Sequence, residues 1–207
     1  MKSVAVFVVL CLGFVNANLK CEHKIPDIPQ AWIDMDNSCT NVVRDHVLEE
    51  LKAALQYLAM GAHFSRDQIN RPGFANLFFK AASEEREHAI KLIHYLLMRG
   101  QLTSGVTGLI NNYKLAPNVT VWTSGSSALK DALNLEASVT SKIRELIKVC
   151  EAAPAFNDYH LVDYLTGDFL TEQYEGQRDL AGKLSTLEKM TGQHGELGEF
   201  LFDKELL

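Results

Sequence analysis

The sequence predicts an all-α protein, a four-helix bundle with one long crossover and a short fifth helix at its C-terminal end. Four long segments repeat apolar residues at the spacing of one helix face, whereas no segment alternates apolar and polar residues as a half-buried strand does. Between the second and third segments lies a stretch rich in Gly, Asn, Thr and Ser that lacks a helical period. Long amphipathic helices and one long connection together favour a bundle.

The expected helix boundaries follow from the residues that interrupt the periodic segments. Pro72 and Gly73 separate the first two helices, Gly100 ends the second, and Pro154 ends the third. The tight turn makes the first two helices antiparallel neighbours. Long helices are expected over residues 41–67, 74–99, 126–152 and 158–189, and the short closing helix over residues 197–206.

The connection over residues 104–125 has a geometric role, although structureless segments of this length are uncommon in compact domains. Helices of about 26 residues are roughly 40 Å long, and an extended chain covers about 3.3 Å per residue. The connection can therefore run the whole length of the bundle. The third helix then starts at the far end, which is a long crossover.

The first 17 residues are typical of a secretory signal peptide, with Lys2, a short apolar run and Ala17 at the expected cleavage site. The run is shorter than the roughly 20 residues of a membrane-spanning helix, and no later segment qualifies. The chain is therefore divided into a signal peptide (1–17), a cysteine-bearing N-terminal arm (18–40) and a helical domain (41–207). We expect it in the secretory pathway, in the ER–Golgi lumen or the extracellular fluid, with no membrane partner.

The chain is acidic, with a net charge of −6 that becomes −7 when Lys2 leaves with the signal peptide. Without a basic stripe, this composition does not indicate a nucleic-acid partner. Mild acidity is compatible with cation handling, a property shared by many proteins.

Three cysteines remain after Cys11 leaves with the signal peptide: Cys21, Cys39 and Cys150. An odd number in an oxidising compartment indicates a bond to another chain or a free thiol. The alternative is a Cys21–Cys39 bridge with Cys150 buried, and the sequence leaves both open. Asn118-Val119-Thr120 is an N-glycosylation acceptor in the expected loop, and Asn37-Ser38-Cys39 is a weaker variant.

Each long helix carries polar side chains in the middle of its apolar stripe. The stripes hold Glu50 and Tyr57, Glu85 and His88, Glu136, and Gln173, in the order of the helices. These positions lie at similar depth once the alternating direction of the helices is taken into account.

Carboxylates in one core layer repel one another, and each costs several kcal/mol when buried without a partner. A bound cation removes this cost. Glutamate oxygens with a single imidazole suit iron or manganese better than structural zinc. Glu85-x-x-His88 has the ligand spacing of di-iron sites in helical bundles, one turn apart on one face.

Each of these residues also has a non-functional interpretation. Residues 83–88 could form a solvated face, and Glu50 could lie on the surface if its stripe is rotated by one position. Gln173 could be a buried amide with ordinary hydrogen-bond partners, and Tyr57 could be buried only for packing. The coincidence of four helices at one depth favours the metal site.

At these residues the sequence resembles ferritin heavy chains. The matching segments cover nearly the whole chain beyond the arm: Glu50-Leu51, Tyr57–Met60, Ser83–Ala89, Ala132–Glu136, Phe169–Gln173 and Gly198–Lys204. The signal peptide and arm make the chain similar to insect-type secreted ferritin heavy chains. The resemblance implies a ferritin-like bundle with a di-iron site and a hollow shell of twenty-four subunits storing ferric mineral.

The resemblance also implies a role for each site residue. The catalytic set would be Glu50, Tyr57, Glu84, Glu85, His88, Glu136 and Gln173. Glu50, Glu85 and His88 would hold the first iron ion. Glu85 would bridge to the second ion, which Glu136 also binds and beside which Gln173 lies. Tyr57 would hydrogen-bond within the site, and Glu84 would be a mobile ligand.

Some positions depart from the heavy-chain pattern. Ile90 stands where an inner-surface carboxylate is often found, so mineral nucleation on this subunit is expected to be weak. Asp163 matches a carboxylate of the channel through which iron enters, but Thr166 replaces the next one. The iron path is expected to use another residue or a partner subunit.

Pattern and resemblance together predict a ferroxidase, an Fe(II):oxygen oxidoreductase with Fe(II) and O2 as substrates and an Fe2+/Fe3+ centre. The first alternative is a non-catalytic structural subunit, which has no need of the complete residue set. The second is a di-iron enzyme acting on an organic substrate. That class tends to carry a second Glu-x-x-His, whereas Val139 follows Glu136 and Gly176 follows Gln173 at this spacing.

The closing helix is too short to join the bundle, and Leu197, Phe200, Leu201 and Leu206 would leave an apolar patch on a monomer. Such patches usually mark interfaces. The alternative is that the helix packs back onto its own bundle. With the resemblance, this predicts a homo- or hetero-oligomer of heavy and light chains.

Overall fold

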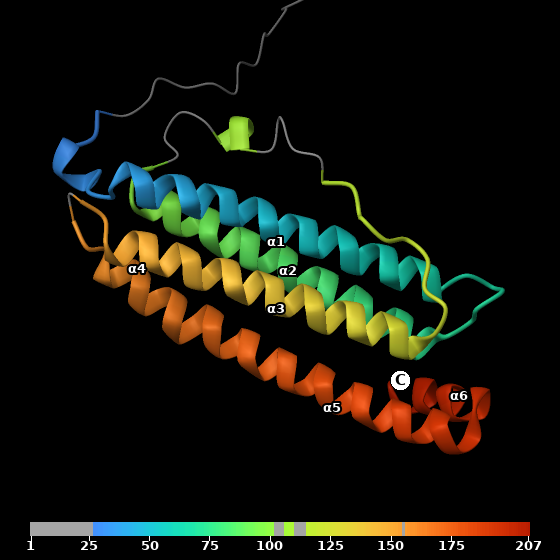
Figure 1. Ribbon diagram of the computed structural model, residues 1–207. Helices are drawn as coiled ribbons and strands as arrows, with labels where there is room; N and C mark the ends of the chain where they lie inside the picture. Colours follow the sequence, from blue (N-terminus) through green and yellow to red (C-terminus); the bar gives the residue numbers. More distant parts are fainter. Residues whose placement is uncertain (1–26, 102–105, 110–114, 155) are drawn as a thin grey trace, which may run out of the picture.

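The computed structural model describes residues 27–101, 106–109, 115–154 and 156–207, and this part of the chain is helical without strands (Figure 1). The expected signal peptide, Cys21 and most of the expected arm lie outside these residues. The long helices are α1 (Asn37–Phe64), α2 (Pro72–Met98), α3 (Gly125–Glu151) and α5 (Leu170–His194). The shorter ones are η1 (Gln30–Trp32), η2 (Val106–Leu109), α4 (Tyr159–Tyr164), η3 (Leu165–Phe169) and α6 (Glu196–Glu205).

The predicted all-α bundle is confirmed, together with its long crossover. In Figure 1, α1 and α2 run antiparallel, and α3 begins near the end of α1, at the opposite end of the bundle from the end of α2. Gln56 of α1 fixes the crossover in place. Its side-chain amide donates to the backbone oxygen of Val119 at 2.7 Å and accepts from the backbone N–H of Asn118 at 3.0 Å. No helix among the described residues is long and apolar enough to cross a membrane.

Local capping sets the helix starts. α1 begins at Asn37, four residues before the expected start, because the Asp36 side chain accepts a hydrogen bond from the backbone N–H of Ser38 at 2.8 Å. α2 begins at Pro72, which suits the first helical position. α3 begins after Ser124, which forms a reciprocal capping box with Ser127.

The fourth helix is not the single uninterrupted helix expected over 158–189. It is built from α4, the π-helical turn η3 and α5, and it continues to His194. A π turn contains one more residue than an α turn, so it rotates the following helix face relative to the preceding one. Phe169 at the end of this turn is buried, and Gln173 lies one turn further along α5.

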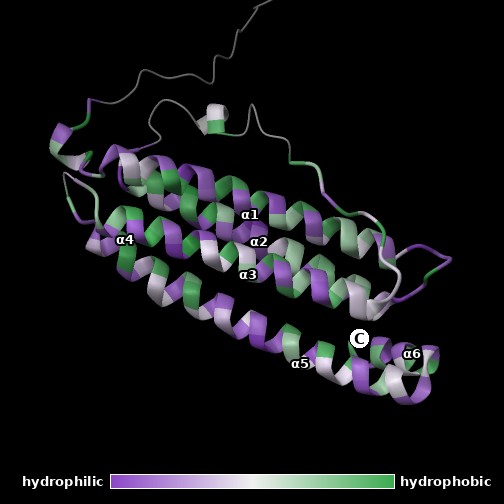
Figure 2. Ribbon diagram, in the orientation of Figure 1, coloured by the Kyte–Doolittle hydropathy of each residue, from purple (hydrophilic) through white to green (hydrophobic). Residues whose placement is uncertain are grey.

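Two apolar clusters fill the bundle, one toward each end. The first gathers around Cys39, Val47, Leu92 and Ile143, and the second around Tyr57, Phe64, Phe78 and Leu129. Figure 2 shows hydrophobic and hydrophilic residues mixed along every long helix, as expected for amphipathic helices with one buried face.

The closing helix α6 packs back onto its own bundle, as the alternative interpretation proposed. Asp203 accepts a hydrogen bond from the backbone N–H of Phe74 at 3.0 Å, and Glu199 accepts one from Gly125 at 2.9 Å. Gly73 allows this approach, because a Cβ there would lie 1.9 Å from the Asp203 carbonyl oxygen. Leu197, Phe200 and Leu201 nevertheless remain exposed, so an apolar patch persists on the monomer.

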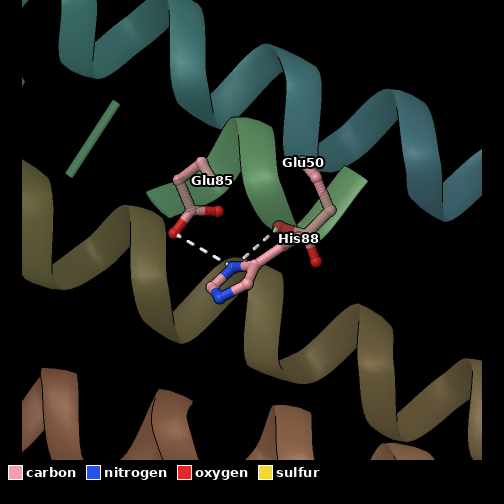
Figure 3. Close-up of side chains that lie close together, drawn as sticks. All are labelled: Glu50, Glu85 and His88. Carbon is pink, nitrogen blue, oxygen red and sulfur yellow. Dashed lines mark ion pairs between the residues drawn. The ribbon is translucent and has the colours of Figure 1, made fainter. Parts of the chain in front are cut away.

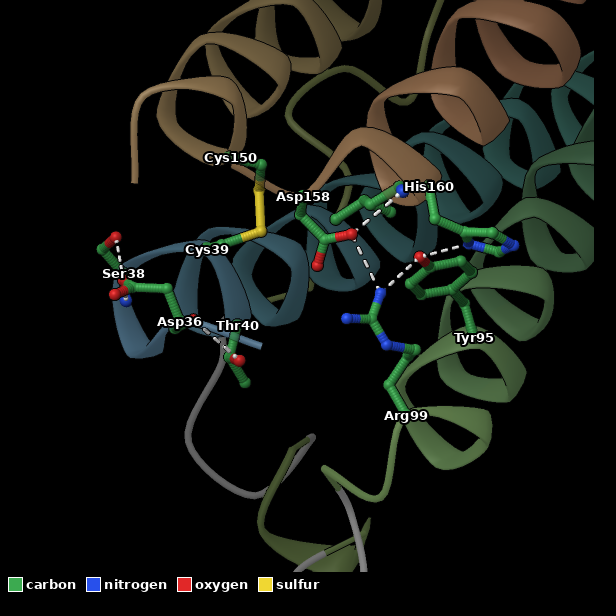
Figure 4. Close-up of a disulfide and its surroundings, with 10 residues drawn as sticks. Asp36, Ser38, Cys39, Thr40, Tyr95, Arg99, Cys150, Asp158 and His160 are labelled. Carbon is green, nitrogen blue, oxygen red and sulfur yellow. Dashed lines mark hydrogen bonds and ion pairs between the residues drawn. A yellow bond between two sulfur atoms is a disulfide. The ribbon is translucent and has the colours of Figure 1, made fainter. Parts of the chain in front are cut away.

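A disulfide joins Cys39 near the start of α1 to Cys150 near the end of α3, with their Cα atoms 4.7 Å apart (Figure 4). The Cys21–Cys39 pairing considered above is therefore wrong. Cys150 is not a free thiol. Three-dimensional proximity decides this pairing, because the two residues are 111 positions apart in the sequence.

A network centred on Arg99 lies beside this bridge (Figure 4). The guanidinium donates to Asp158 at 2.9 Å and to Asp34 at 2.6 Å, and also to the Tyr95 hydroxyl at 2.8 Å. Trp32 donates to the backbone oxygen of Met98 at 2.9 Å. These contacts fix the described end of the arm against α2 and against the link between α3 and α4.

Candidate metal centre

Three of the expected ligands converge between α1 and α2 (Figure 3). Glu50 comes from α1, and Glu85 and His88 come from consecutive turns of α2. Each is at least 96% buried, and each offers one ligand atom within 4.8 Å of the others. His88 Nδ1 lies 3.9 Å from Glu50 Oε2 and 3.8 Å from Glu85 Oε1. The spacing predicted from the sequence therefore produces a compact cluster.

These side chains lack the hydrogen bonds that buried polar atoms normally have. Both oxygens of Glu50, Oε2 of Glu85 and both ring nitrogens of His88 are buried without a well-directed hydrogen bond. Two carboxyl groups and an imidazole with free electron pairs, gathered at one point, form a donor set that fits a divalent metal ion.

Burial disfavours charge on the carboxyl groups. It raises the pKa of Glu50, and it raises that of Glu85 to about 8. Burial by itself lowers the pKa of His88, but the negative charge of Glu85, Glu50 and Glu172 around it outweighs this effect and raises the pKa to about 9. A cation would take the place of the protons that otherwise reduce the repulsion in this cluster.

A second group of polar residues lies next to the first. Tyr57 of α1 donates from its hydroxyl to Glu136 Oε1 of α3 at 2.5 Å. Gln173 of α5 favours the charged form of Glu136, but burial outweighs it and raises the pKa of Glu136 to about 7. All three are buried. Together with Glu85 and His88 they line a cavity of about 390 Å³, although Glu136 lies outside the tight cluster.

Glu84 lines the same cavity but is 48% exposed, with Lys80 Nζ 3.4 Å from its carboxylate. It therefore lies at the mouth, where a mobile side chain has room to move. Each of the seven expected site residues is thus placed at or around one cavity.

Sequence reasoning missed two neighbours of the cluster. Glu172 Oε2 lies 3.2 Å from His88 Nε2 and 3.3 Å from Lys91 at the cavity mouth. Buried His46 has Nε2 2.9 Å from Glu50 Oε1, and burial lowers its pKa to about 4. The sequence does place both residues next to predicted site residues. Glu172 directly precedes Gln173, and His46 lies one turn before Glu50 on the same helix face.

The comparisons with known proteins agree with this architecture. The family described as "Ferritin-like domain" matches residues 42–190. The chain belongs to the ferritin family. A ferritin heavy chain of Papilio xuthus is 58% identical over 99% of this chain and 95% of its own length. The Drosophila melanogaster ferritin heavy chain is 58% identical over 91% of each.

A solved structure extends the likeness to three dimensions. The crystal structure of Trichoplusia ni secreted ferritin is 59% identical and superposes with a TM-score of 0.85, covering 90% of this chain and 97% of that one. The resemblance to insect ferritin heavy chains and the ferritin-like fold are both confirmed.

Proposed function

We propose that this chain is the ferroxidase subunit of an iron-storage ferritin. It oxidises Fe(II) with O2 at the site between the four long helices and contributes to a hollow shell that stores the ferric mineral. The observation that carries this proposal is the buried cluster of Glu50, Glu85 and His88, whose polar atoms are brought together largely without well-directed hydrogen bonds. Membership of the ferritin family supports the same reaction.

Iron is the substrate here, and each residue has a distinct task in binding it. Glu50, Glu85 and His88 receive the first ferrous ion. Glu85 faces the positions of both the first and the second ferrous ion. Glu136 supplies another carboxylate for the second ion. Carboxylate ligands favour the oxidised product, because anionic oxygen stabilises ferric iron more than ferrous iron.

The surrounding residues prepare these ligands. Tyr57 holds Glu136 in a fixed orientation through its hydroxyl. Glu84 and Glu172 at the cavity mouth add negative charge that attracts cations toward the buried cluster. Each of two ferrous ions gives up one electron, and dioxygen accepts both.

The test is oxygen consumption by the assembled full-length protein after addition of ferrous iron. A Glu50→Ala, His88→Ala double variant should lose the fast phase of oxidation. The matched control is Glu145→Ala, His94→Ala, which removes the same residue types from exposed helix positions and should oxidise like wild type. Equal rates in the wild type and the site variant would leave a non-catalytic structural subunit as the better description.

The departures from the heavy-chain pattern bear on iron delivery. Thr166 donates its hydroxyl to the backbone oxygen of Val162 at 2.8 Å, so it offers no carboxylate to a passing ion. Ile90 is partly exposed and apolar. Iron entry and mineral nucleation on this subunit therefore rely on other residues or on a second kind of chain.

We also propose that the chain is exported and assembles into a shell of twenty-four subunits, either alone or with light chains. The secreted relative and the exposed apolar residues of α6 support this proposal. Native mass measurement of the purified protein, alongside a non-reducing gel, tests both assembly and cross-linking through Cys21. A folded monomer at micromolar concentration would contradict it.

A further inference from the structure

Behind Gln173, side chains of α3 and α5 form a directed chain of hydrogen bonds. Gln177 Nε2 donates to Thr140 Oγ1 at 2.7 Å, and the Thr140 hydroxyl donates to Gln173 Oε1 at 2.8 Å. Thr140 and Gln173 are buried, and Gln177 is half-buried. A hydroxyl has a single proton, so Thr140 accepts on one side and donates on the other.

Gln177, the residue of this series farthest from the site, fixes the direction of the hydrogen bonds. Gln177 Nε2 also donates to the backbone oxygen of Gln173 at 3.1 Å. A carbonyl oxygen can only accept. Turning the Gln177 amide around would place its own oxygen against that carbonyl, so that this bond would be lost and two acceptors would face each other. The Gln177 amide therefore has one favoured orientation, and the Thr140 hydroxyl and the Gln173 amide follow it.

The orientation of Gln173 determines what the site receives from it. An amide carries an acceptor oxygen on one side and a donor NH2 group on the other. With its oxygen bound by Thr140, Gln173 turns its NH2 group toward the site, where it favours the charged form of the Glu136 carboxylate.

Building on the proposed function, we infer that Thr140 and Gln177 are positioning residues that present Gln173 to the second iron position as a hydrogen-bond donor and withhold its amide oxygen. Glu85 and Glu136 are then the carboxylates available to that ion. A position with few protein ligands holds iron loosely, which suits a substrate that must leave for the cavity after oxidation.

Two substitutions break or reverse the hydrogen bonds that run from Gln177 through Thr140 to Gln173. Thr140→Val removes the hydroxyl and keeps the shape of the side chain. Gln177→Glu replaces the donor by a carboxylate that accepts from Thr140, so that Thr140 accepts from Gln173 and the Gln173 oxygen turns toward the metal. Thr140→Ser keeps the hydroxyl and is the matched control.

The readout is anaerobic Co(II) titration of the assembled full-length protein, followed by visible absorbance, with Zn(II) calorimetry as a second measurement. Thr140→Val and Gln177→Glu should bind the second ion about five-fold more tightly, which corresponds to roughly 1 kcal/mol, one hydrogen bond. The first ion should bind with unchanged affinity in both variants. Thr140→Ser should match the wild type at both positions.

The outcomes separate this inference from the function on which it rests. Second-ion affinity that is unchanged or weaker in folded Thr140→Val and Gln177→Glu overturns the inference and leaves the two-ion site intact. The same holds if Thr140→Ser behaves like Thr140→Val, because shape and not the hydroxyl would then matter. A wild-type protein that binds no second ion removes the proposed two-ion site, and the inference with it.

A separate observation concerns the two glycosylation sequences. Asn118, Val119 and Thr120 are exposed in the irregular crossover, and Gln56 holds the backbone of the first two against α1. By contrast, Asn37 is the first residue of α1, and Cys39 of that sequence is fully buried in the disulfide. Glycan transfer requires an accessible sequence on an exposed loop.

We infer that Asn118 carries an N-linked glycan and that Asn37 does not. The test is secretion of the full chain from insect cells, followed by treatment with an N-glycosidase and mass measurement. The enzyme should remove one glycan from the wild type, from Thr120→Ser and from Asn37→Gln, and none from Asn118→Gln or Thr120→Val. A wild-type mass that the enzyme leaves unchanged, or a glycan that survives Asn118→Gln, would overturn the assignment.

Discussion

Replacing Cys39 and Cys150 together by alanine tests how far the fold depends on the bridge between α1 and α3. The bridge closes a loop between residues 111 positions apart, and closing a loop of about 100 residues removes roughly 4.7 kcal/mol of chain entropy from the unfolded state. Both side chains are fully buried, so their loss also leaves small voids. We expect the free energy of unfolding to fall by about 5 kcal/mol.

The assay is guanidinium unfolding of wild type and double variant, followed by tryptophan fluorescence at one protein concentration, because assembly itself stabilises subunits. Wild type unfolded with a reductant present should approach the variant. The backbone N–H of Asp158 bonds to the Cys150 carbonyl at 3.0 Å, so the link between α3 and α4 should exchange its amide hydrogens faster in the variant. A variant within about 1 kcal/mol of wild type would refute this reasoning.

Three further predictions concern the site and its support. Tyr57→Phe removes the hydroxyl that orients Glu136; the loss of about 1.4 kcal/mol should slow initial iron oxidation roughly tenfold, measured by stopped-flow absorbance. The pKa values of Glu136, Glu85 and His88 are raised to about 7, 8 and 9, so protons compete with metal for these ligands; Zn(II) affinity from calorimetry should rise with pH and level off above about pH 9, and a flat profile would contradict this. Arg99→Met leaves the Asp158 carboxylate buried and unpaired, so the unfolding free energy in urea should fall by about 2–3 kcal/mol, whereas an exposed control such as Arg144→Met should change little.

The sequence was sufficient to predict the bundle because its signals are local. Apolar spacing located the long helices, and Pro72, Gly100 and Pro154 placed most of their ends within a few residues of the observed positions. The start of α1 lies before the predicted position, because the segment around Cys39 has no clear helical period, whereas Asp36 caps a helix that includes Cys39. The π turn was also missed, because a one-residue change in hydrogen bonding leaves little trace in apolar periodicity.

The site was predictable to the extent that its ligands share helix faces. Glu85 and His88 lie one turn apart, so their convergence follows from helix geometry. The contacts of His46 with Glu50 and of Glu172 with His88 depend on how helices pack, and so does the bridge between Cys39 and Cys150. The orientation of the Gln173 amide depends on Thr140 of α3 and Gln177 of α5. The apolar pattern of one helix cannot show a contact between two helices.

The most direct measurement of the central claim is a crystal structure of the full chain soaked with ferrous iron or Zn(II), with the metal located by its anomalous scattering. We expect an ion within about 2.0–2.2 Å of oxygens of Glu50 and Glu85 and of a ring nitrogen of His88. A second, weaker peak should lie beside Glu136. Metal bound only elsewhere on the protein, with these three side chains unligated, would contradict it.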